Sequence, residues 1–365
     1  MGTRVSDGDF MSPKVSIIVL NWNGWRDTIE CLESIYKIDY DNYDVIVVDN
    51  NSQDGSIEKI KEYCKGDIEV NSKFFKYSKD NKPIEFFEID EEDIEKMLKN
   101  KEKFEKLPSN RRLILIKNRD NYGFAGGNNI GIKFALNVLK PKYICILNND
   151  TVVDRSYLTE LVKTAESDES VGIVGSKIYY YDYNGREDVI WALGGGEIDV
   201  RFGIGRIYMM NKIDNGRYSD VFECKGYIVG CSMLIRREVL EKLKGFDERY
   251  FCYWEEIDLC VRCRRLGYRL LCTPRSVLWH KVAVSSGGED SPIKVYYNTR
   301  NWIYFVKKHN NFLNYLIFLI WFLSYKHIRR VVYFVFLKKD IYLLKYFYMG
   351  VVDGIVGRYC RRDLF

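Results

Sequence analysis

Short apolar runs alternate with amphipathic segments along the first half of the chain. The runs are rich in Ile, Leu and Val and stand at residues 15–20, 43–48, 112–116 and 143–147. Such runs are typical of strands buried on both faces of a parallel sheet. Between the first two, residues 25–37 place apolar side chains at helical spacing, which predicts a right-handed strand–helix–strand unit.

The second half of the chain predicts further strands and two helices. The strands are expected at residues 171–176, within 191–208 together with a loop, at 227–235 and at 276–280. The helices are expected at 237–243 and 255–267. We therefore predict an α/β fold whose central sheet is mostly parallel, Rossmann-like and flanked by helices.

The segment from about residue 58 to 112 has a different composition. It is rich in Lys and Glu and has few apolar positions, apart from Phe86-Phe87 and a helical pattern around Ile94 and Leu98. Alternating charge usually marks a solvated face, so we predict a surface insertion that contributes solubility.

The C-terminal region is apolar and aromatic, with basic clusters between its runs. The runs lie at residues 312–323, 331–337 and 341–352. The first is shorter than the roughly 20 residues that a membrane-spanning helix needs. We predict helices that lie in a membrane interface, with a soluble helical cap and a true span as the alternatives.

Composition narrows the class of protein. With 365 residues and 47% hydrophobic content, the chain can form a substantial core. Its net charge of +5 comes from 56 basic and 51 acidic residues that are interspersed, so we expect no nucleic-acid partner. We divide the chain into a polar tail at 1–13, a domain at 14–300 with halves at 14–155 and 156–300, and a helical region at 301–365.

The N-terminal tail and the cysteines indicate a reducing compartment. Residues 1–13 lack the apolar core of a signal peptide, so we expect a cytoplasmic protein, peripheral on the inner face of the cell membrane. The ten cysteines would then be reduced, and those in apolar segments, such as Cys145 and Cys231, would pack as small core residues. Cys260 and Cys263 form a lone pair, which does not suffice to predict zinc.

Polar side chains follow the predicted strand at 143–147. Asn148, Asn149 and Asp150 would lie at its carboxyl end, where open α/β sheets bind ligands. Their oxygen atoms suit a hard divalent cation, Mg²⁺ or Mn²⁺. The alternative is an ordinary turn, in which these residue types are common.

A glycine-rich segment follows the strand at 112–116. Three glycines at positions 123, 126 and 127 precede Asn128 and Asn129, at the start of a helix predicted over 130–139. They could bring backbone amides up to a phosphate or a base. A strand-to-helix turn with an Asn cap explains them equally well.

An acidic cluster begins the helix at 255–267. Glu255, Glu256 and Asp258 would stabilise the helix N-terminus by themselves. Their aromatic neighbours, however, would desolvate a carboxylate and raise its pKa, which is how a general base is tuned. His280, at the end of the last strand, is either structural or a nitrogen ligand, which Mn²⁺ accepts more readily than Mg²⁺.

The order of these pieces resembles the family 2 glycosyltransferases, inverting enzymes of the GT-A fold, and among them the rhamnosyltransferase-like branch. The resemblance extends from about Lys14 to Asn301. It rests on six segments in order, at residues 15–23, 47–55, 121–129, 147–150, 245–248 and 254–258.

The resemblance implies roles for individual residues. Asp150 would bind the divalent cation, Mn²⁺ or Mg²⁺, with His280 as a further ligand, although the family's first Asp is Asn148 here. Glu256 would be the catalytic base, with Glu255 as the alternative. The remaining residues would bind the donor nucleotide: Asn21, Asp49, Asn51, Gly126, Asn128, Asn148 and Asn149.

The implied reaction transfers a sugar, with inversion, from a UDP- or dTDP-sugar to a saccharide acceptor that is lipid-linked. Two alternatives stay open. One is a non-catalytic membrane-attached scaffold with the same fold. The other is a sugar nucleotidylyltransferase, which would need a glycine-rich, basic loop in place of Asn21-Trp22-Asn23-Gly24.

Overall fold

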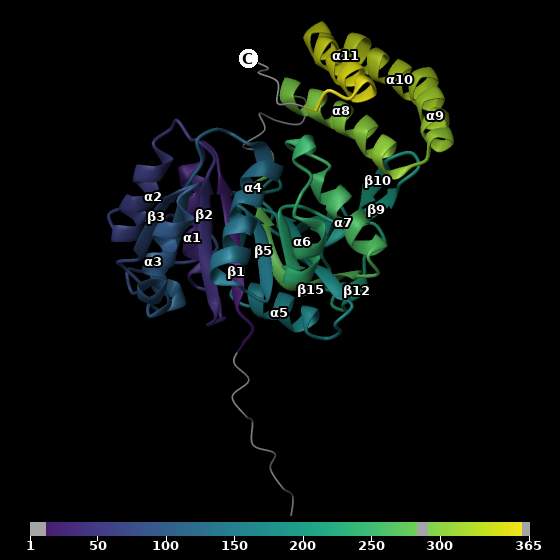
Figure 1. Ribbon diagram of the computed structural model, residues 1–365. Helices are drawn as coiled ribbons and strands as arrows, with labels where there is room; N and C mark the ends of the chain where they lie inside the picture. The colour runs from purple at the N-terminus through teal and green to yellow at the C-terminus, as the bar shows by residue number, and fades with distance from the viewer. Residues whose placement is uncertain (1–11, 283–290, 360–365) are drawn as a thin grey trace, which may run out of the picture.

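A large mixed sheet flanked by helices forms the body of the protein (Figure 1). The computed structural model describes residues 12–282 and 291–359. Within them the main sheet has the strand order β11-β8-β7-β14-β5-β1-β2-β4-β3, and β15, β6 and β12 pair outside this path. A second sheet has the order β10-β9-β13.

The N-terminal half of the main sheet is parallel, as predicted. Its strands pair in register, for example Ile18 with Ile46 and with Ile146. The strands are β1 (Val15–Asn21), β2 (Tyr43–Asp49), β3 (Glu85–Asp90), β4 (Arg112–Lys117) and β5 (Tyr143–Asn148). The intervening helices are α1 (Trp25–Ile35), α2 (Ser56–Lys65), α3 (Ile94–Glu105), η1 (Ser109–Arg111), α4 (Gly123–Phe134) and η2 (Ala135–Leu139).

The segment predicted as a surface insertion is part of the fold. Its strand β3 pairs in parallel with β4 and completes the edge of the sheet. Ile60, Tyr63 and Phe104, from the helices on either side of β3, are fully buried. Charged residues such as Lys103 are exposed, although Lys82 is buried in an ion pair with Glu33. The composition therefore hid an amphipathic helix–strand–helix unit.

The C-terminal half of the main sheet is mixed, and here the prediction of a mostly parallel sheet was wrong. Strand β14 (Ser232–Arg236) is antiparallel to β5 and to β7. The other strands are β6 (Thr151–Val153), β7 (Val171–Tyr180), β8 (Val189–Leu193), β9 (Gly195–Asp199), β10 (Ile204–Ile207), β11 (Lys212–Ile213), β12 (Phe222–Glu223), β13 (Tyr227–Ile228) and β15 (Arg269–His280). The helices are α5 (Tyr157–Ala165), α6 (Arg237–Leu243), η3 (Glu248–Tyr250) and α7 (Glu255–Arg265).

The single strand predicted over 227–235 is two strands. β13 belongs to the small sheet and β14 to the main one, and residues 229–231 connect them at the edge of the site. The run is apolar on both sides of the break because both strands are buried, and Gly230 is the sign of the break in the sequence.

Helix α4 begins at Gly123, seven residues before the predicted start at 130. A Cβ atom added at Gly127 would lie 2.5 Å from Leu20 Cδ1, and one at Gly131 would lie 2.8 Å from Ile18 Cγ2. These glycines let the helix pack directly on β1.

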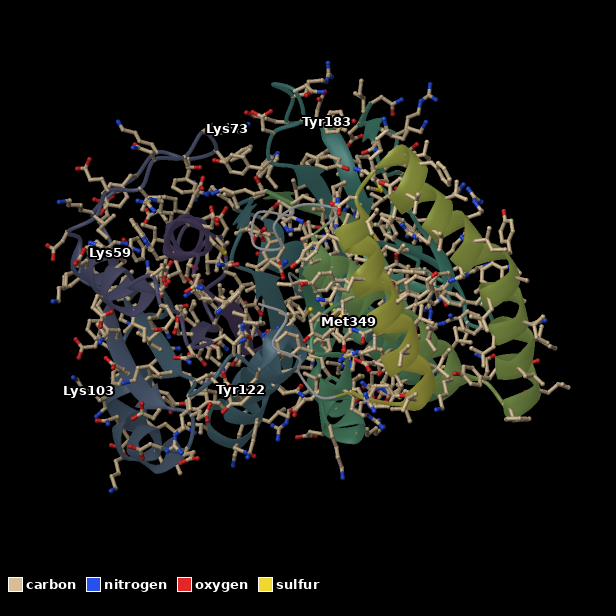
Figure 2. All side chains as sticks on the ribbon, turned by 90° about the horizontal axis from the view of Figure 1, so that it is seen from above. Lys59, Lys73, Lys103, Tyr122, Tyr183 and Met349 are labelled. Carbon is tan, nitrogen blue, oxygen red and sulfur yellow. The ribbon has the colours of Figure 1, made fainter. Side chains whose placement is uncertain are left out.

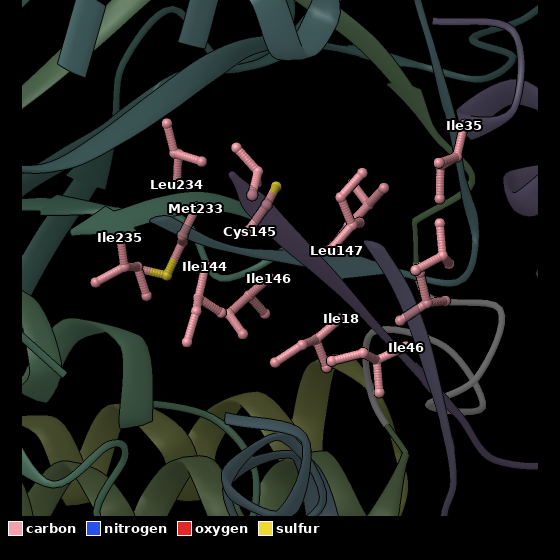
Figure 3. Packing of buried hydrophobic residues seen from close by; sticks show 14 of the residues in the cluster. Ile18, Ile35, Ile46, Ile144, Cys145, Ile146, Leu147, Met233, Leu234 and Ile235 are labelled. Atoms are coloured by element: carbon pink, nitrogen blue, oxygen red, sulfur yellow. The ribbon is translucent and has the colours of Figure 1, made fainter. Parts of the chain in front are cut away.

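The core lies on both sides of the central strands. Figure 3 shows Ile18, Ile46 and Ile146 side by side from three neighbouring strands, with Met233 and Leu234 from β14 beside them. All five side chains are buried, and so are the predicted core thiols Cys145 and Cys231. This packing fixes the strand ends on which the site is built.

The C-terminal region forms a helical layer at one end of the molecule (Figure 1). Its helices are α8 (Pro292–His309), α9 (Phe312–Trp321), η4 (Phe322–Lys326), α10 (His327–Val332), η5 (Tyr333–Leu337) and α11 (Ile341–Val356). The predicted domain boundary at 300/301 falls inside α8. Figure 2 shows α11, which carries Met349, in this layer, far from Lys59 and Lys103.

The helices of this layer have a packed face and an exposed face. Gly350 and Gly354 allow α11 to contact α8 closely, because an added Cβ would lie 2.7 Å from Tyr296 O and 2.9 Å from Ile303 Cβ. On the outer face, Phe312 and Leu337 are 80% and 73% exposed. Among residues 12–282 and 291–359, no helix is both long and apolar enough to cross a membrane.

Candidate active site

A cavity of about 580 Å³ lies at the carboxyl ends of the central strands. Six of the predicted site residues line it. They come from the end of β5, the start of α7 and the end of β15: Asn148, Asn149, Asp150, Glu255, Glu256 and His280. Segments more than a hundred residues apart in the chain therefore meet at one place.

Strand pairing brings Asp150 and His280 together. β15 runs antiparallel to β6, and His280 pairs with Thr151, next to Asp150. His280 Nε2 lies 3.1 Å from Asp150 Oδ1, and both side chains are buried. Burial by itself would lower the pKa of His280, but the charges of Asp150 and Cys231 outweigh it and raise that pKa to about 10. Burial would raise the pKa of Asp150, yet His280 holds it below its usual value.

The donor atoms in this cavity fit a divalent cation that also binds a substrate. Asn148 Oδ1 and His280 Nδ1 are buried without a hydrogen-bond partner. In the described part of the chain no group of three or more His, Cys, Asp and Glu side chains could hold a metal ion by itself. Mg²⁺ is commonly held by one or two carboxylates together with substrate phosphates, and Mn²⁺ also accepts a histidine. Asp150 and His280 would supply the protein's ligands, and His280 would lose its proton as the cation binds.

Glu255 and Glu256 begin helix α7 on the opposite wall. Burial raises the pKa of Glu256 to about 6, while backbone amides at the helix N-terminus act in the opposite direction. Burial and the charge of Glu256 raise the pKa of Glu255 well above its usual value. An oxygen atom of each carboxyl group, Oε2, is buried without a partner. Gly230 makes room for Glu256, since a Cβ there would lie 3.3 Å from Glu256 Cβ.

The loop before α7 has an unusual backbone. Phe251, Tyr253 and Trp254 have φ values of 65°, 67° and 79°. Residues other than glycine rarely adopt this left-handed backbone conformation, which costs about 1–2 kcal/mol per residue. Gly123 faces the loop, because a Cβ there would lie 2.4 Å from Phe251 O. Other parts of the structure must hold this loop in place.

Arg300 and Asn301, from α8, hold it. Asn301 Nδ2 lies 2.8 Å from Tyr250 O, 2.8 Å from Cys252 O and 2.9 Å from Tyr253 O. Arg300 Nη2 donates to Arg249 O at 2.7 Å and to Tyr250 O at 2.8 Å. Arg300 Nε donates to Asn301 Oδ1 at 2.9 Å, which orients the amide. We call these contacts the carbonyl clamp.

A buried ion cluster ties the same two helices together. Asp258 of α7 lies 2.6 Å from Arg262 Nε, 2.6 Å from Lys308 Nζ and 2.8 Å from His309 Nε2. Burial would raise the pKa of Asp258, but these partners hold it below its usual value. Asp258, the third member of the predicted acidic cluster, therefore anchors α7 to α8 and does not line the cavity.

A second cavity, of about 490 Å³, lies between α7 and the C-terminal helices. It and the first cavity share Tyr227, Tyr253, Glu256, Lys294 and Asn298 as lining residues. Glu256 thus faces both spaces, whereas Glu255 lines only the first. This difference favours Glu256 over Glu255 as the residue that could act between two bound molecules.

Five predicted donor-binding residues do not line either cavity. Asn21 donates to Asp49 Oδ1 at 2.7 Å, and both side chains are buried. Asn51 Oδ1 accepts from Gln53 Nε2 at 3.1 Å. Gly126 and Asn128 lie inside α4, where Asn128 Nδ2 donates to Phe124 O. Contact of these five with a nucleotide stays a prediction.

Sequence reasoning missed several lining residues. Asn50, Trp22, Trp191 and Gly230 all line the first cavity. The ring of Trp191 meets that of His280 edge-on at 4.8 Å. Asn50 follows directly on β2, so its position at a strand end could have identified it. Trp191 carries no such signal, because it reaches the site through the topology of the second half of the sheet.

Two family profiles match the chain. The profile described as glycosyltransferase-like family 2 matches residues 101–301, and that of glycosyl transferase family 2 matches residues 16–82. The first alone covers more than half of the chain.

Three known proteins illustrate the similarity. The low-salt glycan biosynthesis hexosyltransferase Agl10 of Haloferax volcanii is 25% identical over 190 residues, which cover 50% of this chain and 56% of Agl10. The rhamnosyltransferase WbbL of Escherichia coli is 28% identical over 168 residues, 42% of this chain and 58% of WbbL. The matched segments thus span little more than half of either relative. The structure of the mannosyltransferase PcManGT from Pyrobaculum calidifontis, with GDP-Man and Mn²⁺, superposes with a TM-score of 0.53 at 15% identity over 96% of this chain and 89% of PcManGT. At this identity it establishes a shared fold.

The raised pKa of Glu255 predicts how stability depends on pH. Since the folded state keeps this carboxyl protonated above the unfolded pKa of about 4.3, it binds more protons than the unfolded state, and stability falls as pH rises from there toward the folded pKa. Glu255→Gln should remove this loss, worth up to about 1.4 kcal/mol per pH unit. Denaturant unfolding of wild type and Glu255→Gln at several pH values between about 4.5 and 7 measures this difference in stability. Parallel dependences of the unfolding free energy on pH would contradict the prediction.

Proposed function

The chain belongs to glycosyltransferase family 2, and on this basis we propose that it transfers a sugar, with inversion, from a nucleotide sugar to a saccharide acceptor. The position of Glu256 between two cavities carries the proposal. A transferase must hold its donor and its acceptor at once, with a base at the point where they meet. UDP- and dTDP-sugars are the proposed donors.

The first cavity is the proposed donor site. Asp150 and His280 would hold a divalent cation there, and the buried oxygen of Asn148 is free to join them. When bound, the cation neutralises charge on the diphosphate and stabilises the nucleotide as leaving group. The backbone pairing of β6 with β15 fixes the positions of Asp150 and His280.

The second cavity is the proposed acceptor site. Glu256 would accept the proton of the attacking hydroxyl, because its raised pKa of about 6 lies close to neutrality while the group remains ionised at pH 7. Direct attack on the anomeric carbon forms one bond as the bond to the nucleoside diphosphate breaks. This single displacement inverts the configuration.

We infer the class of the acceptor from the exposed side chains of the helical layer. Its exposed apolar residues gather on α9, η4, α10, η5 and α11, and they include Phe312, Ile320, Phe336, Leu337 and Ile341. Basic residues at 329, 338 and 339, all exposed, lie among them. Apolar helical faces with flanking cations bind anionic bilayer surfaces. We therefore place the protein on a membrane surface, where it would meet a lipid-linked acceptor in glycan biosynthesis.

The donor site is tested by calorimetric titration with UDP and with dTDP, with and without Mn²⁺. One nucleotide should bind in a Mn²⁺-dependent manner, and Asp150→Ala should weaken that binding at least about tenfold, because the cation loses a charged ligand. Glu256→Gln should leave it unchanged. If neither nucleotide binds the folded protein with Mn²⁺, the proposed donors are wrong.

Catalysis by Glu256 is tested by nucleotide release from the sugar donor that binds. Glu256→Gln should reduce the rate about 10²- to 10⁴-fold, the usual contribution of a general base. The wild-type rate should fall about tenfold per pH unit below pH 6, where Glu256 becomes protonated. Glu238→Gln, on the exposed face of α6, is the matched control. An unchanged rate in Glu256→Gln would show that Glu256 is not the base and would point to Glu255, whereas no release by wild type would favour the scaffold alternative.

Membrane attachment is tested by flotation with phosphatidylcholine vesicles, with and without phosphatidylglycerol. The protein should float with both, and better with the anionic lipid. The double variant Phe336→Ser/Leu337→Ser should lose most of this binding, since both side chains are exposed and contribute apolar area. Ile213→Ser, an exposed apolar position on β11, should bind as wild type does. No flotation of wild type would refute the attachment, and equal flotation of all three proteins would show that Phe336 and Leu337 do not carry it.

A further inference from the structure

The second cavity combines features that the reaction at Glu256 does not explain. Besides Glu256, it is lined by three cationic residues, Lys294, Lys326 and Arg330. Lys294 lies on α8, while Lys326 and Arg330 lie on η4 and α10. The last two fall outside both matched family segments, which cover residues 16–82 and 101–301.

These three cations have no carboxylate within ion-pair distance among residues 12–282 and 291–359. Nearby Lys308 differs, since it pairs with Asp247 at 2.7 Å and Asp258 at 2.6 Å. Lys326 Nζ lies 5.8 Å from the ring centre of Trp302 and 5.7 Å from that of Trp321. The rings hold the ammonium group at the cavity wall without neutralising its charge.

The remaining lining is largely apolar. Ile198, Ile204, Trp302, Phe334 and Phe347 contribute to the wall. The helices that supply Lys326 and Arg330 also carry the exposed apolar face on the outside of the molecule. The cavity therefore presents one acidic group, three uncompensated cations and aromatic surface, beside helices suited to a lipid surface.

We propose that Lys294, Lys326 and Arg330 form a binding site for the diphosphate group of a lipid diphosphate-linked acceptor. The cations compensate the diphosphate charge, the acceptor sugar extends toward Glu256, and the lipid leaves the cavity along the apolar helices. This assignment rests on the proposed glycosyl transfer and specifies its acceptor. It makes the C-terminal helices the part of the chain that selects the acceptor.

Farnesyl diphosphate is a suitable probe, because it carries the diphosphate and an apolar chain without a sugar. Calorimetric titration without divalent cations keeps the donor cavity from competing for the phosphates. Wild type should bind farnesyl diphosphate more tightly than inorganic pyrophosphate and should not bind farnesol. The double variant Lys326→Gln/Arg330→Gln should bind it at least about tenfold more weakly, as expected for the loss of two charged contacts.

Arg329→Gln is the matched control. It removes the same charge one residue away, but Arg329 donates to Tyr325 Oη at 2.9 Å and does not line the cavity. It should bind farnesyl diphosphate as wild type does. Lys294→Gln, on a different helix, should weaken binding independently. Equal melting temperatures would show that the variants fold.

Four results would overturn the proposal: no binding of farnesyl diphosphate to wild type, equal binding to the double variant, equal binding of farnesol, or equal binding of pyrophosphate. The third would indicate a purely apolar site, and the fourth a site for free phosphate. Failure of the glycosyl transfer proposal is distinguishable, because it would abolish Mn²⁺-dependent nucleotide binding, which is measured on the same proteins and does not involve Lys326 or Arg330, since neither lines the donor cavity.

Discussion

The carbonyl clamp is the constraint on which the site depends. Three residues other than glycine have positive φ values just before Glu255: Phe251, Tyr253 and Trp254. At about 1–2 kcal/mol each, such a loop does not persist unless other contacts over-determine it. Asn301 and Arg300, both fully buried, offset this strain through their bonds to the loop carbonyls. The position of Glu256 is therefore set from α8.

The clamp also joins the two parts of the chain. α8 holds the loop before α7, pairs with Asp258 through Lys308 and His309, and packs on α11. The helical layer is consequently a structural component of the active site. One face of this layer closes the second cavity, and the other exposes the apolar side chains that we assign to a membrane.

The sequence predicts the elements whose pattern is local. The parallel strands were found because each is a short, doubly buried apolar run. Asp150 and His280 were singled out because polar groups end such runs, and Glu256 because an acidic cluster begins a helix beside aromatic residues. The start of α4 was missed because glycines usually end helices, whereas Gly127 and Gly131 are required by contact with β1. The break between β13 and β14 was missed because a single glycine, Gly230, is a weak signal within an apolar run. Asn301 could not be assigned, because binding to three distant carbonyls depends on tertiary structure.

The most direct test of this account is the rate of nucleotide release by Asn301→Ala, set against its Mn²⁺-dependent nucleotide affinity. Asn301 touches neither the predicted cation ligands nor Glu256, so the donor affinity should match that of wild type. If the clamp positions Glu256, the rate should fall about a hundredfold, the effect expected when a catalytic group is misplaced by about an ångström. A folded Asn301→Ala protein with the wild-type rate would contradict the account.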